Sequence, residues 1–246
     1  METIKLYNGT VTLLFDREKH AFYKEGKRIT GVTTYTGVLD KPALIPWATK
    51  MMGIYLHQNW DLAKVKTEEE KFILIEAAKK EYRNIREEAA ELGKEAHAWA
   101  EEFTKGNKPK MPENEQVRNA VAAFLDWFKQ SGIKITAQEK FIYSKKYNYA
   151  GIMDWEGKKD GSLLIGDYKV TNAIYDEMRF QLALYWQARE EESGKEYNEG
   201  HIIQFGKQTA EFARLLIPRR EYLKDLKAAL GCVQIKNRLN ELRYGN

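Results

Sequence analysis

Two strand-like runs separated by Asp160-Gly161 give the clearest secondary-structure signal in the sequence. Residues 147–159 and 162–170 are rich in aromatic and aliphatic side chains, with polar residues interspersed. Asp-Gly favours a two-residue hairpin loop, because both positions of a type I′ turn have φ > 0. The pattern therefore predicts a β-hairpin whose loop is Asp160-Gly161.

This loop fixes which residues of the predicted hairpin oppose one another. Lys159 faces Ser162, and counting outwards from that pair places Asp154 opposite Asp167. Directly opposed Cβ atoms lie about 4.5–5.5 Å apart. Lys169, two residues beyond Asp167, points to the same face of its strand. The hairpin is thus predicted to gather two carboxylates and a lysine.

Two carboxylates this close repel each other unless a cation lies between them or one of them holds a proton. Carboxylate oxygens suit a hard divalent ion such as Mg²⁺, and a neighbouring lysine can stabilise charge at a phosphate. The alternative is a surface hairpin with solvated charges, since acid-x-Lys triplets such as Glu69-Glu70-Lys71 occur elsewhere in the chain. The position of Asp167-Tyr168-Lys169 directly after an apolar strand favours a site.

The rest of the pattern predicts alternating helices and strands. Pro42 and Pro46 frame a helix start near Trp47, and the Thr- and Gly-rich segment before it is interpreted as an N-terminal cap packed on the core. The predicted strands cover 4–15, 20–30, 133–143, 200–206 and 210–217. The predicted helices cover 68–104, 113–131, 174–192 and 218–243. A capping box at Thr67 marks the start of the first of these helices. The longest of these helices contains Gly93 and is expected to be broken or kinked.

Two polar residues stand out against this pattern. Glu139 shares a predicted strand face with Ile135, Ala137 and Phe141, so it is either a ligand or the partner of a lysine. His97 lies four residues after Gly93 and shares its helix face. A single histidine in a helix is more often structural, although imidazole is also a common metal ligand.

Composition narrows the class of protein. The 246 residues are 43% hydrophobic, which is enough for a sizeable core, and the net charge of +4 permits a nucleic-acid partner without requiring one. The single cysteine, Cys232, excludes a disulfide framework and a multi-cysteine metal or iron–sulfur site. The first residues lack a signal-peptide pattern, and no apolar run is long enough to span a bilayer. We therefore expect a cytoplasmic protein with no membrane partner.

The order of these motifs resembles that of a known family. A helix with G-K-E-A-H is followed by a strand with Glu139, strands with A-G-I-M-D and G-D-Y-K, and a helix with Q-L-A-L-Y. This order resembles the RecB-like branch of the PD-(D/E)XK nuclease superfamily, in particular its phage-type exonucleases. The segment V-T-T-Y-T-G-V-L-D-K-P-A-L-I-P-W-A also looks like the start of those proteins. The chain departs from many of them in having Val-Thr-Asn after the lysine.

The resemblance implies a role for each residue of the motifs. It implies that metal ligands come from His97, Asp154, Asp167 and the Tyr168 carbonyl, and that Lys169 is the catalytic lysine. It further implies that Gln181 and Tyr185 support the site and contact DNA, and that Glu139 occupies a less regular acidic position. The implied cofactors are one or two Mg²⁺ or Mn²⁺ ions, with no iron–sulfur cluster.

The implied fold is a mixed α/β, restriction-endonuclease-like core: a central mixed sheet of about four or five strands flanked by helices. A single nuclease domain is expected, with an N-terminal extension over 1–66, a catalytic core over 67–217 and a C-terminal helix over 218–246.

The implied function is a metal-dependent deoxyribonuclease, an exonuclease acting at single- or double-stranded DNA ends in recombination, repair or phage DNA processing. Its setting would be a bacterial or phage-infected cell, with a homo-oligomer or a recombination protein as further partners. The alternative is a catalytically silent DNA-end-binding or recombination-accessory module on the same fold.

Overall fold

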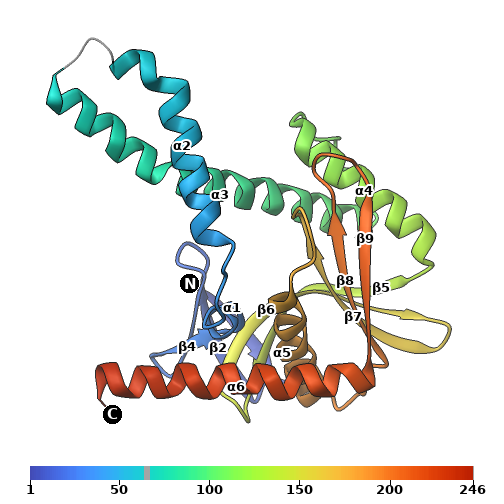
Figure 1. Ribbon diagram of the computed structural model, residues 1–246. Helices are drawn as coiled ribbons and strands as arrows, with labels where there is room; N and C mark the ends of the chain where they lie inside the picture. Colours follow the sequence, from blue (N-terminus) through green and yellow to red (C-terminus); the bar gives the residue numbers. More distant parts are fainter. Residues whose placement is uncertain (64–66, 246) are drawn as a thin grey trace. The chain divides into compact units, whose positions relative to one another are not determined.

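The computed structural model describes residues 1–63 and 67–245 (Figure 1). Its contacts divide the chain into two compact units, Met1–Leu39 with Ala96–Asn246, and Asp40–Glu95. These divisions differ from those predicted at residues 67 and 218, and the assignment of a single nuclease domain stays a prediction. All of the candidate site residues lie in the first unit.

One mixed sheet organises the first unit. Its strand order is β1-β2-β3-β4-β6-β7-β8-β9, with β5 paired to β6 on its other edge. The β4–β6 and β7–β8 pairs are parallel and the others antiparallel. The strands are β1 (Glu2–Leu6), β2 (Val11–Asp16), β3 (Ala21–Lys24), β4 (Lys27–Gly31), β5 (Lys134–Ser144), β6 (Tyr149–Lys159), β7 (Ser162–Lys169), β8 (Glu199–Phe205) and β9 (Phe212–Pro218).

The sheet is therefore larger than predicted, although its mixed class is confirmed. The estimate of about four or five strands is too low, because the N-terminal strands do not stay apart from the core. Thr30 and Gly31 of β4 pair in parallel with Tyr149 and Ala150 of β6. This pairing joins the N-terminal meander to the strand that carries Asp154, and so brings residues of β3 and β4 near the site.

The β6–β7 hairpin has the predicted loop and register. Asp160 and Gly161 both have positive φ, 49° and 82°, as a type I′ turn requires. Lys159 pairs with Ser162, and the antiparallel ladder continues to Trp155 and Gly166.

Helices cover both faces of the sheet, as the fold class requires. On one face α4 (Glu115–Ser131) packs Phe124 and Trp127 against the rings of Tyr168 and Phe205. On the other face α5 (Asp176–Ser193) contributes to a core that includes Ile165. Each face buries apolar surface, which is the main source of stability for a layered fold.

The last helix, α6 (Arg219–Tyr244), packs against α5 and the short helix α1 (Val32–Thr36). Trp186 stacks on Tyr222 with ring centroids 4.0 Å apart. Tyr35 donates a hydrogen bond from its hydroxyl to Asn237 Oδ1 at 3.0 Å. This bond anchors the C-terminal part of α6 to α1.

The second unit is helical, with α2 (Leu44–Ala63) and the first part of α3 (Glu68–Thr104). The capping box is confirmed: the Thr67 backbone N–H donates to Glu70 Oε2 at 2.9 Å, and the Glu70 N–H donates to Thr67 Oγ1 at 3.4 Å. The expected break is wrong, because α3 continues as one helix from Glu68 to Thr104 through Gly93, and a kink in it stays a prediction. None of the helices in the described residues is long and apolar enough to cross a membrane.

Candidate functional site

Three potential metal ligands come together from three elements. His97 of α3, Glu139 of β5 and Asp154 of β6 each offer one ligand atom, and these atoms lie within 4.8 Å of one another. His97 Nδ1 is 3.8 Å from Asp154 Oδ2. All three side chains are half-buried, so the cluster stays accessible while its charges are only partly solvated.

Glu139 reaches the cluster through an irregular strand. The β5–β6 register shifts between Ile135 and Ala137, so the strict alternation predicted for this strand does not hold. Beyond the shift, Gln138 pairs with Trp155 and Lys140 with Met153, which places Glu139 across from Asp154. Glu139 has a φ of 45°, a left-handed conformation that is uncommon for a residue other than glycine. Such outliers cluster at functional sites.

Asp167 and Lys169 form a buried ion pair beside this cluster. Lys169 Nζ lies 2.6 Å from Asp167 Oδ2, and only 1% of the Asp167 side chain is exposed. Asp167 Oδ1 has no hydrogen-bond partner among the described residues. Leaving a buried carboxylate oxygen unpaired is costly, so this oxygen is available to a ligand.

Gln181 and Tyr185 extend the Asp167–Lys169 ion pair by two side-chain hydrogen bonds. Lys169 Nζ donates to Gln181 Oε1 at 3.2 Å, and Gln181 Nε2 donates to the Tyr185 hydroxyl at 2.8 Å. Gln181 and Tyr185 are thus neighbours on one face of α5, as their spacing predicts. The chain fixes the position of the lysine ammonium.

Tyr168 connects the carboxylate of Asp154 to the imidazole of His97. Its backbone N–H donates to Asp154 Oδ2 at 2.6 Å, and its backbone also hydrogen-bonds the His97 ring. The ring of Tyr168 meets that of His97 edge-on, with centroids 6.0 Å apart. Whether the Tyr168 carbonyl is a metal ligand stays a prediction.

Burial shifts the pKa of every titratable group in the site. Together with the nearby Lys169 charge, it lowers the pKa of His97 to about 4. It raises the pKa of Glu139 to about 8, with the negative charge of Asp154 adding to the effect. It raises the pKa values of Asp154 and Asp167 to about 6, against the opposing effect of Lys169.

These properties fit a divalent cation. At neutral pH the His97 imidazole is uncharged, as a metal ligand must be. The Asp154 and Asp167 carboxylates are close enough for the charge of one to raise the pKa of the other, and Asp167 Oδ1, outside the three-ligand cluster, has no hydrogen-bond partner among the described residues. A set of carboxylate oxygens with one imidazole suits Mg²⁺ or Mn²⁺ better than a soft, thiolate-binding metal.

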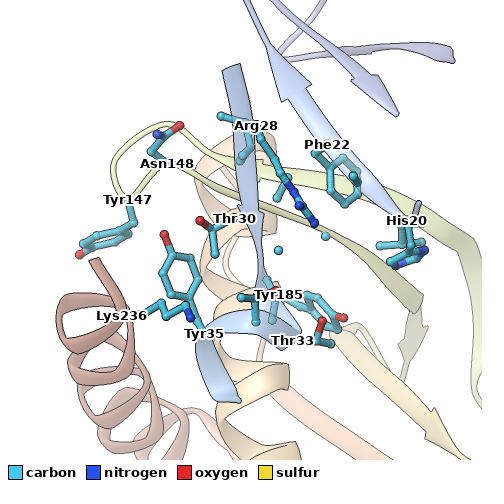
Figure 2. A pocket seen from close by; sticks show the side chains of 18 of the residues that line it. His20, Phe22, Arg28, Thr30, Thr33, Tyr35, Tyr147, Asn148, Tyr185 and Lys236 are labelled. Atoms are coloured by element: carbon cyan, nitrogen blue, oxygen red, sulfur yellow. The ribbon is translucent and has the colours of Figure 1, made fainter. Parts of the chain in front are cut away.

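A cavity of about 900 Å³ opens onto the cluster. Its wall includes His97, Glu139, Asp154 and Tyr185; Figure 2 shows Tyr185 in this wall. The other four predicted residues, Asp167, Tyr168, Lys169 and Gln181, are not part of this wall. They make the ion pair, the backbone contacts and the polar chain described above.

The N-terminal segment also lines the cavity, which the sequence interpretation missed. Arg28, Thr30 and Thr33 belong to its wall, and the Arg28 side chain extends into it in Figure 2. Arg28 has no carboxylate partner among the described residues. The run of Thr and Gly after residue 29 was the one available signal, and it does not by itself indicate a cavity. The segment is part of the site and not only a cap.

Comparisons with known proteins give little further guidance. No protein-family model and no curated protein matches the chain. Among solved structures, "Crystal structure of SSO0001" matches at 12% identity and a TM-score of 0.30, over 47% of this chain and 57% of that chain. An alkaline exonuclease (LHK-Exo) from Laribacter hongkongensis matches at 12% identity and a TM-score of 0.30, over 49% of this chain and 70% of that chain. The structure of LHK-Exo in complex with dAMP matches at 10% identity and a TM-score of 0.33, over 56% of this chain and 77% of that chain. At these TM-scores the likenesses carry no argument about this chain.

Proposed function

We propose that this protein is a Mg²⁺- or Mn²⁺-dependent deoxyribonuclease that acts as an exonuclease at DNA ends. The observation that carries the proposal is the juxtaposition of the His97, Glu139 and Asp154 cluster with the Asp167–Lys169 ion pair. Three carboxylates, an imidazole and a lysine next to one cavity suit the hydrolysis of an anionic phosphodiester.

In the proposed site, His97, Glu139, Asp154 and Asp167 hold the cation. When bound, the divalent ion supplies an activated water and offsets the charge on the leaving oxygen. The resemblance of G-D-Y-K to the nuclease motif places Lys169 as the catalytic lysine, and its pKa supports this role. Burial would lower that pKa, but Asp167 and Asp154 more than offset the effect, so it is raised and the ammonium stays charged.

The charged ammonium of Lys169 stabilises the negative charge that develops on the phosphate. Gln181 and Tyr185 hold this lysine in place through the chain Lys169–Gln181–Tyr185. Arg28 in the cavity wall gives the substrate a second cation. The polar chain therefore serves positioning, and the direct chemistry falls to the ligands and the lysine.

Digestion of end-labelled DNA tests the proposal. Linear DNA labelled at its 5′ or 3′ end, and closed circular DNA of the same sequence, would be incubated with Mg²⁺, with Mn²⁺ and with EDTA. We expect the linear DNA alone to be degraded, and only with a metal ion. DNA binding without cleavage in either metal would overturn the proposal in favour of a silent end-binding module, and cleavage of the circle would overturn the exonuclease assignment.

A further inference from the structure

One part of the cavity wall is formed by α6, whose residues no sequence motif identified. Lys236, Asn240 and Tyr244 line the cavity at intervals of four residues. Residues at this spacing lie one above the other on a helix face. The three side chains therefore form one ridge, which we call the α6 ridge, facing the same space as the metal-ligand cluster.

The side chains of the α6 ridge are free to bind a ligand. Lys236 is a half-buried residue that makes no ion pair with any residue that the structure describes, and its side chain is near Tyr35 in Figure 2. No hydrogen bond engages the Asn240 carboxamide within the described part of the chain. Tyr244 is 80% exposed. By contrast, the neighbouring Glu241 carboxylate is paired with Arg238 at 2.9 Å.

The chemistry of the ridge matches the parts of a nucleotide. An unpaired lysine neutralises a phosphate, a carboxamide hydrogen-bonds a base edge, and an exposed tyrosine offers a ring on which a base stacks. The cavity wall carries both signs of charge. Glu139, Asp154 and Glu241 are acidic, and Arg28 and Lys236 are cations that make no ion pair within the described residues.

The volume of the cavity fits a single nucleic-acid strand and not a duplex. Its volume of about 900 Å³ is at the upper end of small-ligand sites, so it holds a few nucleotides and not a duplex. The ridge from Lys236 to Tyr244 extends roughly 12 Å at 1.5 Å per helical residue. Stacked nucleotides of one strand repeat about every 3.4 Å, so the ridge spans about three of them.

We propose that the α6 ridge is a binding track for about three nucleotides of a single DNA strand leading away from the metal-ligand cluster. This inference rests on the proposed nuclease function for its substrate class and goes beyond it by assigning the strand's path and its contacts. Tyr35 supports the track, because its bond to Asn237 holds this part of α6 in place.

Equilibrium binding tests the track independently of cleavage. Fluorescein-labelled oligothymidylates of two to eight nucleotides would be titrated by anisotropy in EDTA, which prevents metal-dependent cleavage. The test variant is K236A/N240A/Y244A, and the control is K227A/Q234A/L242A, which removes the same charge from exposed positions of α6 outside the cavity. We expect at least a tenfold weaker Kd for the test variant and less than a twofold change for the control.

Salt dependence gives a second measurement that folding defects do not imitate. Each phosphate neutralised on a single strand contributes about 0.7 to the slope of log K against log salt concentration. K236A should reduce the slope by about this amount, whereas K227A should leave it unchanged. Unchanged binding and slope for the ridge variants would overturn the track even if the wild type is a nuclease. Weakened binding would uphold the track even if no cleavage is found.

Discussion

Asp154 accepts a hydrogen bond from the backbone N–H of Tyr168 at 2.6 Å, just beyond the end of the β6–β7 ladder, where Asp154 precedes Trp155 and Tyr168 lies two residues after Gly166. In this bond the side-chain oxygen of Asp154 accepts from the neighbouring strand, where a backbone carbonyl oxygen accepts within the ladder. The bond orients the Asp154 carboxylate, and Asp154 lies in the cavity wall with His97 and Glu139. Hairpin geometry and site geometry are therefore coupled at this residue.

Removal of the lysine should abolish most of the proposed activity. We expect Lys169→Ala to lower the rate of metal-dependent DNA degradation by about 10²–10³-fold, the usual effect of losing one charge-stabilising donor. Lys158→Ala, an exposed lysine of the same hairpin, is the control and should retain the wild-type rate. Rates would be measured on end-labelled linear DNA. A Lys169→Ala protein that is folded and fully active would contradict the assignment.

The metal-free protein should lose stability between about pH 6.5 and 8. In the folded state the pKa of Glu139 is raised to about 8, mainly by burial, while the unfolded chain releases this proton near pH 4.3. Unfolding therefore releases a proton, and the free energy of unfolding falls with rising pH by up to about 1.4 kcal/mol per pH unit. Urea denaturation in EDTA at several pH values measures this slope.

Glu139→Gln should remove most of that slope, because an amide does not titrate. His97 has its pKa lowered to about 4 in the folded state. It therefore makes the free energy of unfolding rise with pH, but only below its ordinary pKa near 6.5. The pKa values of Asp154 and Asp167 are about 6, so Glu139 dominates the chosen window. A slope that persists unchanged in the variant would show that Glu139 is ionised in the folded protein.

Divalent ions should stabilise the folded protein. A ligand that binds only the folded state at 100 times its Kd adds about 2.7 kcal/mol, so Mg²⁺ or Mn²⁺ should raise the Tm measured by calorimetry. The rise should disappear in Asp154→Asn, which weakens the ligand set without changing its shape. Glu76→Gln, a helix-surface substitution remote in sequence from the ligands, should retain it. An equal rise in all three proteins would place the ion elsewhere.

Gly166 should not tolerate a side chain. A Cβ at this position would lie 2.0 Å from Trp155 Cζ2, so Gly166→Ala should destabilise the protein by about 1–3 kcal/mol through overpacking. It should also reduce activity, since Asp167 is the next residue. Gly231→Ala is the matched control in helix α6, where a Cβ meets nothing within 4 Å, and it should stabilise by about 0.5–1 kcal/mol. Thermal unfolding of both variants tests the contrast.

The hairpin was predictable because its determinants are local. Asp160-Gly161 specifies the turn, the turn specifies the register, and the register places Asp154 and Asp167 on adjacent strands. The helix of Gln181 and Tyr185 and the cap at Thr67 follow from the same short-range rules. Each depends on residues a few positions apart, so the sequence pattern contains the information.

The remaining site depended on contacts between distant segments. The position of Glu139 follows from a register shift and a left-handed residue in β5, and a pattern of alternating residues cannot indicate either. The sheet has nine strands because β4 pairs in parallel with β6. This pairing places Arg28 and its neighbours in the cavity wall. No local signal distinguishes such a pairing from an independent N-terminal cap.

By itself, the sequence determined the hairpin, the helices and the identity of the charged residues on them. Only the tertiary structure decided that His97, Glu139 and Asp154 share one cluster, that Asp167 and Lys169 form an ion pair, and that α6 lines the cavity. The physical reason is that turn and helix preferences act over a few residues. A cavity forms where elements far apart in the chain pack together and leave their polar side chains facing one space.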